Sequence, residues 1–181
     1  MFARDRLKNP KYHGSYVTLK NLRYDNGIFC FFYINPDLGK AIKKDNSNRV
    51  FMDEKNGNWG VTTWAMSERK FTENLEKGLF DSANIADKSG SVADLRAGKL
   101  LDEKGNVKVI DPTANAVSQF FRMGNTSVQI RTSGYAKFSD LEINPDVVSG
   151  KKTVDISGIL TIYKEDVQFT LIDLDGVKVN E

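Results

Sequence analysis

Cysteine and histidine are nearly absent from this chain of 181 residues, which contains one of each, Cys30 and His13. A single cysteine excludes an internal disulfide framework, and one cysteine with one histidine excludes the usual zinc ligand sets. The sequence supplies no orienting acid or nucleophile that would make His13 a catalytic base. We therefore expect no metal, no cofactor and no enzymatic activity.

Long hydrophobic runs are also missing. No segment approaches the roughly 20 apolar residues that a membrane helix needs, and the first 14 residues, MFARDRLKNPKYHG, have no apolar signal-peptide core. The glycines do not form a phosphate-binding GxxxxGK[ST] pattern. These absences predict a cytoplasmic protein (in the host cytoplasm if the source is viral) without a membrane partner.

Net charge is low, at +2, but it is unevenly distributed. Residues 1–50 contain ten Lys and Arg against four Asp, so the rest of the chain is net negative. A basic portion in a near-neutral protein favours attraction to a polyanion. The alternative is that Lys40, Lys43 and Lys44 only keep an exposed loop soluble.

Aromatic residues are dense between Tyr16 and Ile34, in the segment YVTLKNLRYDNGIFCFFYI. Asn26-Gly27 is a favoured two-residue turn, because a type I′ turn needs positive φ at both central positions. The segment is therefore predicted to form a β-hairpin, in which Tyr24 lies opposite Phe29.

Side chains alternate between the two faces of such a hairpin. One face is predicted to carry Tyr16, Thr18, Lys20, Leu22, Tyr24, Phe29, Phe31 and Tyr33, and the other Val17, Leu19, Asn21, Arg23, Cys30, Phe32 and Ile34. Only one face can be the core of a single domain. We expect the face with the tyrosines and Lys20 to be the exposed one, since tyrosine suits a half-wet surface.

The remaining elements follow from periodicity, caps and turn residues. Ser67 is expected to cap a three-turn helix that stops at Gly78, and SVADLRAG (91–98) to form a helical turn. A second helix is expected from Pro112 or Thr113 through Phe121. Strands are predicted at 50–52, 59–66, 107–110, 127–130, 135–143, 153–163 (with a bulge or bend at Gly158), 167–174 and 177–179.

This order predicts a mainly β fold with short helices, either a small antiparallel barrel or a strongly curved sheet. It is compatible with an oligonucleotide-binding (OB-like) barrel, which often has a helix between its third and fourth strands. We expect residues 1–14 to form a basic arm and residues 15–181 to form one β-rich domain with an irregular insertion around 81–106.

The favoured function is non-sequence-specific binding of single-stranded nucleic acid, DNA rather than RNA, by a protein of a phage or mobile element that can form a homo-oligomer. Rings would stack on bases and Lys or Arg would contact phosphates. Because Trp59 and Trp64 should point opposite ways, one is expected in the core and the other exposed. The candidate binding residues are Tyr16, Lys20, Arg23, Tyr24, Phe29, Phe31, Tyr33, Lys43, Lys44, Arg49, Trp59 and Trp64.

Two other classes stay open. In a structural or assembly protein, such as a virion or secretion-apparatus subunit, neighbouring subunits would cover the two-sided apolar strands. The basic arm and residues 81–106 would then become ordered only in the assembly. The third possibility is an inhibitor or adaptor that acts on another protein.

Overall fold

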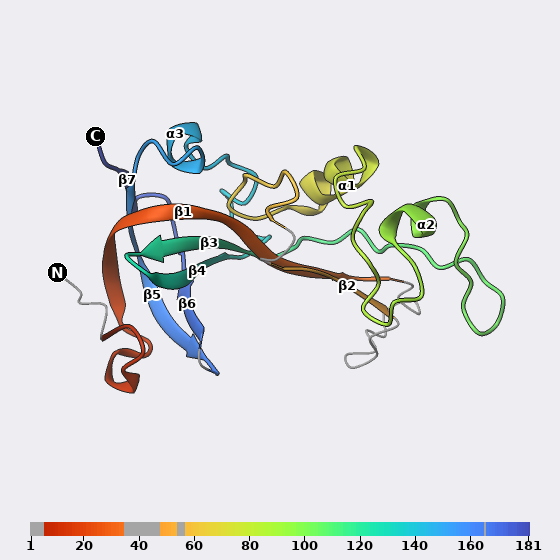
Figure 1. Ribbon diagram of the computed structural model, residues 1–181, viewed down its shortest axis with the longest axis horizontal. Helices are drawn as coiled ribbons and strands as arrows, with labels where there is room; N and C mark the ends of the chain where they lie inside the picture. The colour runs from red at the N-terminus through yellow and green to blue at the C-terminus, as the bar shows by residue number, and fades with distance from the viewer. Residues whose placement is uncertain (1–5, 35–47, 54–56, 165) are drawn as a thin grey trace.

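The computed structural model describes residues 6–34, 48–53, 57–164 and 166–181. Within these residues seven strands form one sheet in the order β2-β1-β3-β4-β6-β5-β7, accompanied by three short α-helices (Figure 1). The strands are β1 (Tyr16–Tyr33), β2 (Arg49–Met52), β3 (Val117–Met123), β4 (Thr126–Thr132), β5 (Val154–Tyr163), β6 (Asp166–Thr170) and β7 (Val177–Val179). The helices are α1 (Glu68–Glu76), α2 (Val92–Arg96) and α3 (Pro145–Val148), after a short 3₁₀ helix, η2 (Pro10–Tyr12).

Five of the strands pair in a closed circuit, which we call the strand ring. β1 pairs with β3, β3 with β4, β4 with β6, β6 with β5, and β5 again with β1. The β4–β6 pair is parallel and the other pairs are antiparallel. The prediction of a mainly β chain with a strongly curved sheet is confirmed.

The predicted hairpin at the N-terminus is wrong, because residues 16–33 form one continuous 18-residue strand. Asn26 has the expected positive φ of 50°, but it lies where the β1–β3 register shifts between Tyr24 and Ile28. A second shift, at Asn21 (φ 54°), interrupts the β1–β5 register. Both asparagines therefore serve β-bulges, which bend and twist a strand without reversing it.

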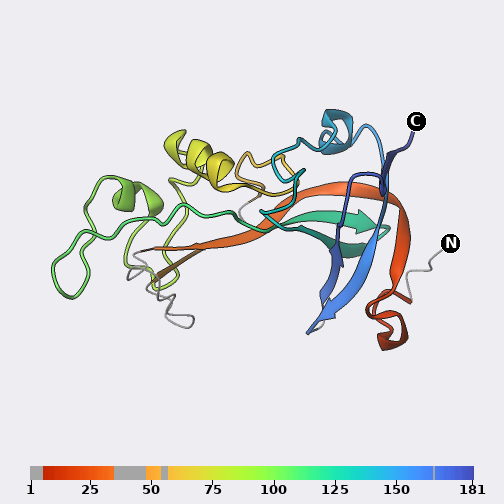
Figure 2. The same cartoon turned by 180° about the vertical axis from the view of Figure 1, so that it is seen from behind.

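Two hydrophobic cores lie along β1. This strand runs from the strand ring to the region beneath α1 (Figures 1 and 2). The ring core fills the interior of the strand ring, with Leu19, Leu22, Phe121, Ile130 and Phe169 among its buried members. The second core lies beneath α1 and α2, against the C-terminal half of β1 and β2.

Helices α1 and α2 begin where the sequence predicted. The Ser67 side chain accepts a hydrogen bond from the Lys70 backbone N–H at 3.1 Å, and Ser91 forms a capping box with Asp94. Each helix contributes to the second core, as with Phe71 of α1 and Leu95 of α2.

The 81–106 segment packs into the second core together with α2, which lies inside it. Its buried members are Ala83, Ile85, Val92 and Leu95. The expectation that this segment becomes ordered only in an assembly is wrong.

Three predicted elements take other forms. Residues 59–66 form no regular strand, because Trp59 and Gly60 both have positive φ and the buried Gln119 amide N–H groups donate to the carbonyls of Val61 and Thr63. Residues 107–110 form only isolated bridges. Residues 135–143 run through turns before α3.

The predicted second helix is also wrong, because its apolar residues belong to strand β3. Residues 117–121 are all buried, so side chains on both faces of the strand are out of solvent. Such a strand has no apolar–polar alternation, so a short apolar run can be misread as helical.

The strands predicted around 50–52, 127–130, 153–163 and 177–179 are confirmed as β2, β4, β5 and β7. Gly158 forms no bulge, because the register of β5 on β1 is continuous from Ser157 through Gly158 to Ile159. Instead, a Cβ at this position would lie 2.3 Å from the Thr170 carbonyl oxygen. Glycine therefore permits the close approach of β6 to β5 that helps to close the ring.

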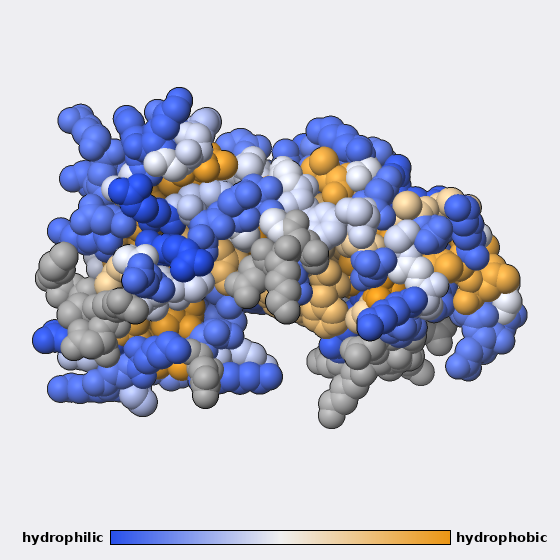
Figure 3. All heavy atoms as spheres, viewed as in Figure 1, coloured by the Kyte–Doolittle hydropathy of each residue, from blue (hydrophilic) through white to orange (hydrophobic). Residues whose placement is uncertain are grey.

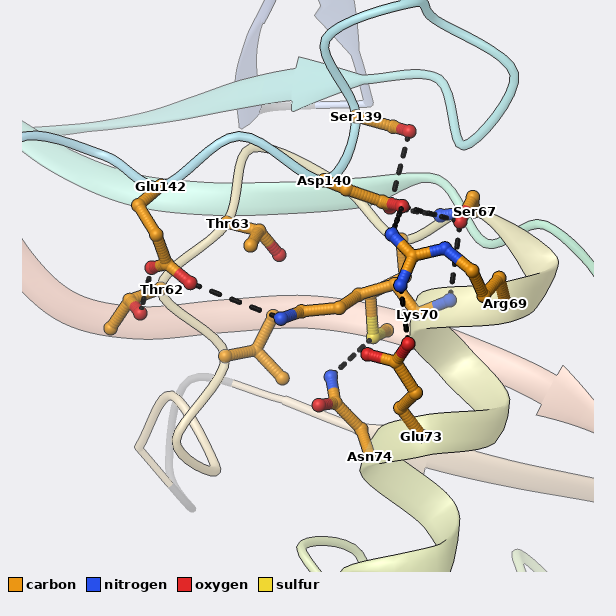
Figure 4. A network of polar contacts seen from close by, with 12 residues as sticks. Thr62, Thr63, Ser67, Arg69, Lys70, Glu73, Asn74, Ser139, Asp140 and Glu142 are labelled. Atoms are coloured by element: carbon orange, nitrogen blue, oxygen red, sulfur yellow. Dashed lines mark hydrogen bonds and ion pairs between the residues drawn. The ribbon is translucent and has the colours of Figure 1, made fainter.

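A network of polar contacts ties the two cores together (Figure 4). Asp140 lies on the segment that leads to Ile143 of the ring core, and it accepts hydrogen bonds from the Ser67 backbone N–H at 2.7 Å and the Ser67 hydroxyl at 2.6 Å. Arg69 of α1 donates to the same carboxylate at 3.0 Å. These bonds lower the pKa of Asp140 although its desolvation by itself raises it.

Candidate functional site

Four aromatic side chains form a continuous row on one face of β1 and β2, which we call the aromatic ladder: Phe29, Phe31 and Tyr33 of β1, with Phe51 of β2. Ring centroids lie 5.6 Å apart for Phe31–Tyr33, 5.8 Å for Phe31–Phe51 and 6.4 Å for Phe29–Phe51. All four side chains are half-buried, so each keeps part of its ring accessible to solvent.

Because side chains alternate along a strand, the aromatic ladder lies on one face of β1 and β2 and the second core lies on the other face. Cys30, Phe32 and Ile34 alternate with the ladder residues of β1 and are fully buried beneath α1 and α2. Burial raises the pKa of the Cys30 thiol far above its usual value, so this thiol is an inert core group rather than a nucleophile.

A cation lies at the far end of the ladder. The Arg49 guanidinium carbon is 5.5 Å from the centroid of the Tyr33 ring, and the two residues are register partners in the β1–β2 pair. The Nε atom of Arg49 is buried without a hydrogen-bond partner among the described residues. A guanidinium stacked on a ring beside further half-buried rings suits recognition of a base together with its phosphate.

A pocket of about 300 Å³ adjoins the other end of the ladder, at Phe29. It crosses four strands of the sheet on the outer face of the strand ring, because Gln129 alternates with Val128 and Ile130, which point into the ring core. Figure 3 shows a hollow below the middle of the molecule, between its two ends. The pocket is lined by Phe29, Asp53, Phe120, Ser127, Gln129, Asp166 and Val167.

The structure brings together only part of the predicted binding set. Phe29, Phe31, Tyr33 and Arg49 are neighbours on one face, whereas Tyr16 lies at the opposite end of β1.

Lys20 and Arg23 also lie outside the ladder. Lys20 is near the Asp155 carboxylate, and Arg23 is the register partner of Arg122 on β3. Lys43 and Lys44 lie outside the described residues.

Two predicted members of the exposed face pack inward, because the bulge at Asn21 shifts the alternation. Leu22 is fully buried in the ring core. Tyr24 makes an edge contact with Phe121 at 5.4 Å, and its hydroxyl donates to the Gln119 side chain. Burial raises the pKa of Tyr24, partly offset by a hydrogen bond from Asn58.

The tryptophans occupy the two cores rather than one core and one surface. Trp64 is only 3% exposed and stacks on Phe121 at 6.3 Å, so its ring is not available to a ligand. Trp59 is half-buried against the second core, and its indole N–H has no hydrogen-bond partner among the described residues.

Three residues of this face were not predicted from the sequence. Phe51 was within a correctly predicted strand, but its position opposite Phe31 depends on the β1–β2 pairing, which the sequence analysis did not predict. Phe120 was assigned to a helix, and Gln129 carried no signal beyond alternation with Val128 and Ile130.

No protein-family model, curated protein or solved structure matches this chain. Among the described residues there is no cluster of three or more His, Cys, Asp or Glu that could hold a metal ion. The described part of the chain also contains no helix with the length and apolar character needed to cross a membrane. An origin in a phage or another mobile element stays a prediction.

Proposed function

We propose that this protein binds single-stranded nucleic acid, DNA in the first instance, across the outer face of β1, β2, β3 and β4. The observation that carries the proposal is the aromatic ladder, in which four half-exposed rings follow one another and end at Arg49. Base stacking on an aromatic ring contributes about 1–3 kcal/mol per base with little sequence preference.

The strand order supports the same proposal. We interpret the strand ring as an OB-like barrel, with β1, β3, β4, β5 and β6 as its five strands in chain order. Its third and fifth strands pair in parallel, and α3 lies between the third and the fourth. In that architecture the face of the second and third strands, with the loops beside it, binds oligonucleotides. In this chain that face carries Phe120 and Gln129.

The proposal is tested by the fluorescence anisotropy of a labelled 20-residue oligothymidylate at low salt. Phe31→Ala removes the ring that contacts both Tyr33 and Phe51, and we expect it to weaken binding about tenfold. Arg49→Gln should weaken binding and reduce its dependence on salt.

Tyr135→Ala is the matched control, because Tyr135 is an aromatic residue that is 85% exposed and lies outside the ladder. We expect this variant to bind like the wild type. Absence of binding by the wild type at low salt, or an equal loss in Tyr135→Ala and Phe31→Ala, would contradict the proposal. An oligouridylate of the same length tests the preference for DNA.

A role in an assembly is the second candidate, favoured by one observation. Leu101, Val107 and Val109 are each about half exposed, and Leu101 and Val107 bridge each other across a protruding loop. Light scattering after size-exclusion chromatography tests this candidate. A strict monomer at high protein concentration, unchanged in Val109→Ser, would count against it.

A further inference from the structure

The pocket beside Phe29 has the size and the walls of a base-binding site. Its volume of about 300 Å³ is large enough for a purine base. Phe29 of β1 is half-buried and supplies an accessible ring that also belongs to the aromatic ladder, and Phe120 of β3, which is 5% exposed, adds a buried aromatic lining. A strand whose bases stack on the ladder would therefore reach this pocket with its next base.

The polar groups of the pocket come from two neighbouring parallel strands. Gln129 of β4 is the register partner of Gln168 on β6, so Ser127 and Asp166, each two positions earlier, also lie side by side. The side-chain carbonyl oxygen of Gln129 is buried and has no hydrogen-bond partner among the described residues. A buried polar atom without a partner is costly, and a ligand that donates a hydrogen bond to it removes that cost.

The chemistry of these groups selects among ligands. The Gln129 carbonyl and the Asp166 carboxylate are hydrogen-bond acceptors, and the described lining residues include no lysine or arginine. Such a pocket disfavours phosphate and favours an edge with adjacent N–H donors. Guanine presents two such donors, N1–H and the N2 amino group, whereas thymine presents one between two acceptors.

We infer that this pocket binds a guanine base of the nucleic-acid strand, with Gln129 and Asp166 accepting hydrogen bonds from its N1–H and N2 amino groups. The inference rests on the proposed function and adds to it a base preference at one position. The ladder binds bases of any kind, and the pocket distinguishes one of them.

Competition among three 21-residue oligonucleotides tests the inference. They are oligothymidylate and the same strand with either guanine or hypoxanthine at the centre. We expect the guanine strand to bind the wild type about tenfold more tightly than oligothymidylate, and the hypoxanthine strand, which lacks the N2 amino group, to fall between them.

Variants assign the preference to the pocket. Gln129→Leu and Asp166→Asn should each reduce the ratio of guanine-strand affinity to oligothymidylate affinity, and thermal unfolding at the wild-type temperature shows that the fold is intact. Gln168→Leu is the matched control, because Gln168 is the neighbour of Gln129 on β6 but does not line the pocket. It should keep the preference.

The outcomes separate the two proposals. Equal binding of all three strands by the wild type would overturn the guanine pocket and leave the proposed function standing. Failure of every strand to bind would overturn both. Free guanosine monophosphate should compete poorly, since it makes no contact with the ladder; competition as strong as that of the guanine strand would overturn the assignment to a strand.

Discussion

The two cores of this protein are built in different ways along the same strand. The ring core is surrounded by the strands of the ring, which supply most of its members, and residues outside the strands, such as Trp64 and Val147 of α3, complete it. The second core is covered on one side by α1, α2 and the loops around them, and on the other side by β1 and β2. The side chains on the outward face of the sheet also differ between the two cores.

Over the strand ring, the outward face of β4 and β6 is polar, with residues such as Gln129, Gln168 and Thr170. Beneath the second core, the outward face of β1 and β2 is the aromatic ladder. Large rings left on the uncovered face of a sheet cost free energy of hydration and are commonly binding surfaces. The candidate binding site therefore lies where the polar outward face of the strand ring meets the aromatic ladder.

The largest expected effects come from removing one aromatic residue from each core. Phe121→Ala in the ring core and Phe71→Ala in the second core should each lower the free energy of unfolding by about 3–5 kcal/mol, because both side chains are fully buried. We expect a single unfolding transition in each variant, since β1 belongs to both cores.

Tryptophan fluorescence during urea unfolding reports the unfolding of each core separately. Trp59→Phe leaves Trp64 as a reporter of the ring core, and Trp64→Phe leaves Trp59 as a reporter of the second core. Coincident transitions in the two backgrounds support one cooperative unit. If Phe71→Ala unfolds the Trp59 region while the Trp64 signal stays native, the two regions are independent.

Removing the polar contacts between the two cores should lower the free energy of unfolding by a smaller amount. Asp140→Asn should lower the free energy of unfolding at pH 7 by about 1–2 kcal/mol, because the carboxylate accepts charge-assisted hydrogen bonds from Ser67 and Arg69. The pKa of Asp140 is lower in the folded state than the usual value of about 3.9. Its stabilisation is therefore present above that value and is lost as the pH falls through the folded pKa.

Urea unfolding of wild type and Asp140→Asn between pH 7 and pH 2 checks this sign. The difference should be largest at pH 7 and should shrink in acid. Asp175→Asn is the control, because Asp175 is exposed, and it should change little at either pH. A difference that grows as the pH falls would show that the carboxylate is not held in its charged form.

The smallest expected effect concerns Asn26, at the register shift where β1 passes from one core to the other. Asn26→Ala should cost about 1 kcal/mol, because alanine disfavours a φ of +50°. Asn26→Gly should be at least as stable as the wild type by thermal unfolding. Equal stability of the alanine and glycine variants would mean that the backbone relaxes at this position.

Much of the fold can be predicted from local signals. Ser67 and Ser91 are caps that act within one turn, and the alternation in β4 and β5 reflects a sheet with one face in the ring core. The hairpin prediction failed because a two-residue turn and a bulge both need a residue with positive φ. Asn26-Gly27 satisfies either, and only the partners β2 and β3 decide between them.

The site could be predicted only in part for the same reason. The exposure of Phe29, Phe31 and Tyr33 follows from their alternation with Cys30 and Phe32, whichever partner β1 has. The addition of Phe51 and Phe120 depends on pairings between residues far apart in the sequence. Tyr24 and Leu22 were misplaced because one bulge reverses the facing of every residue on one side of it.

The register between β1 and β3 has a consequence for how this chain could be altered. Phe29 and Ser118 are paired neighbours, although almost the whole second core lies between them in the sequence. The chain thus leaves the strand ring at Phe29 and returns to it at Ser118, beside the point where it left. This is the arrangement expected of a segment inserted into a smaller domain. A short linker from β1 to β3 would preserve the order of the ring strands, and among the described residues of the excised stretch Trp64 is the one buried member of the ring core that would have to be replaced.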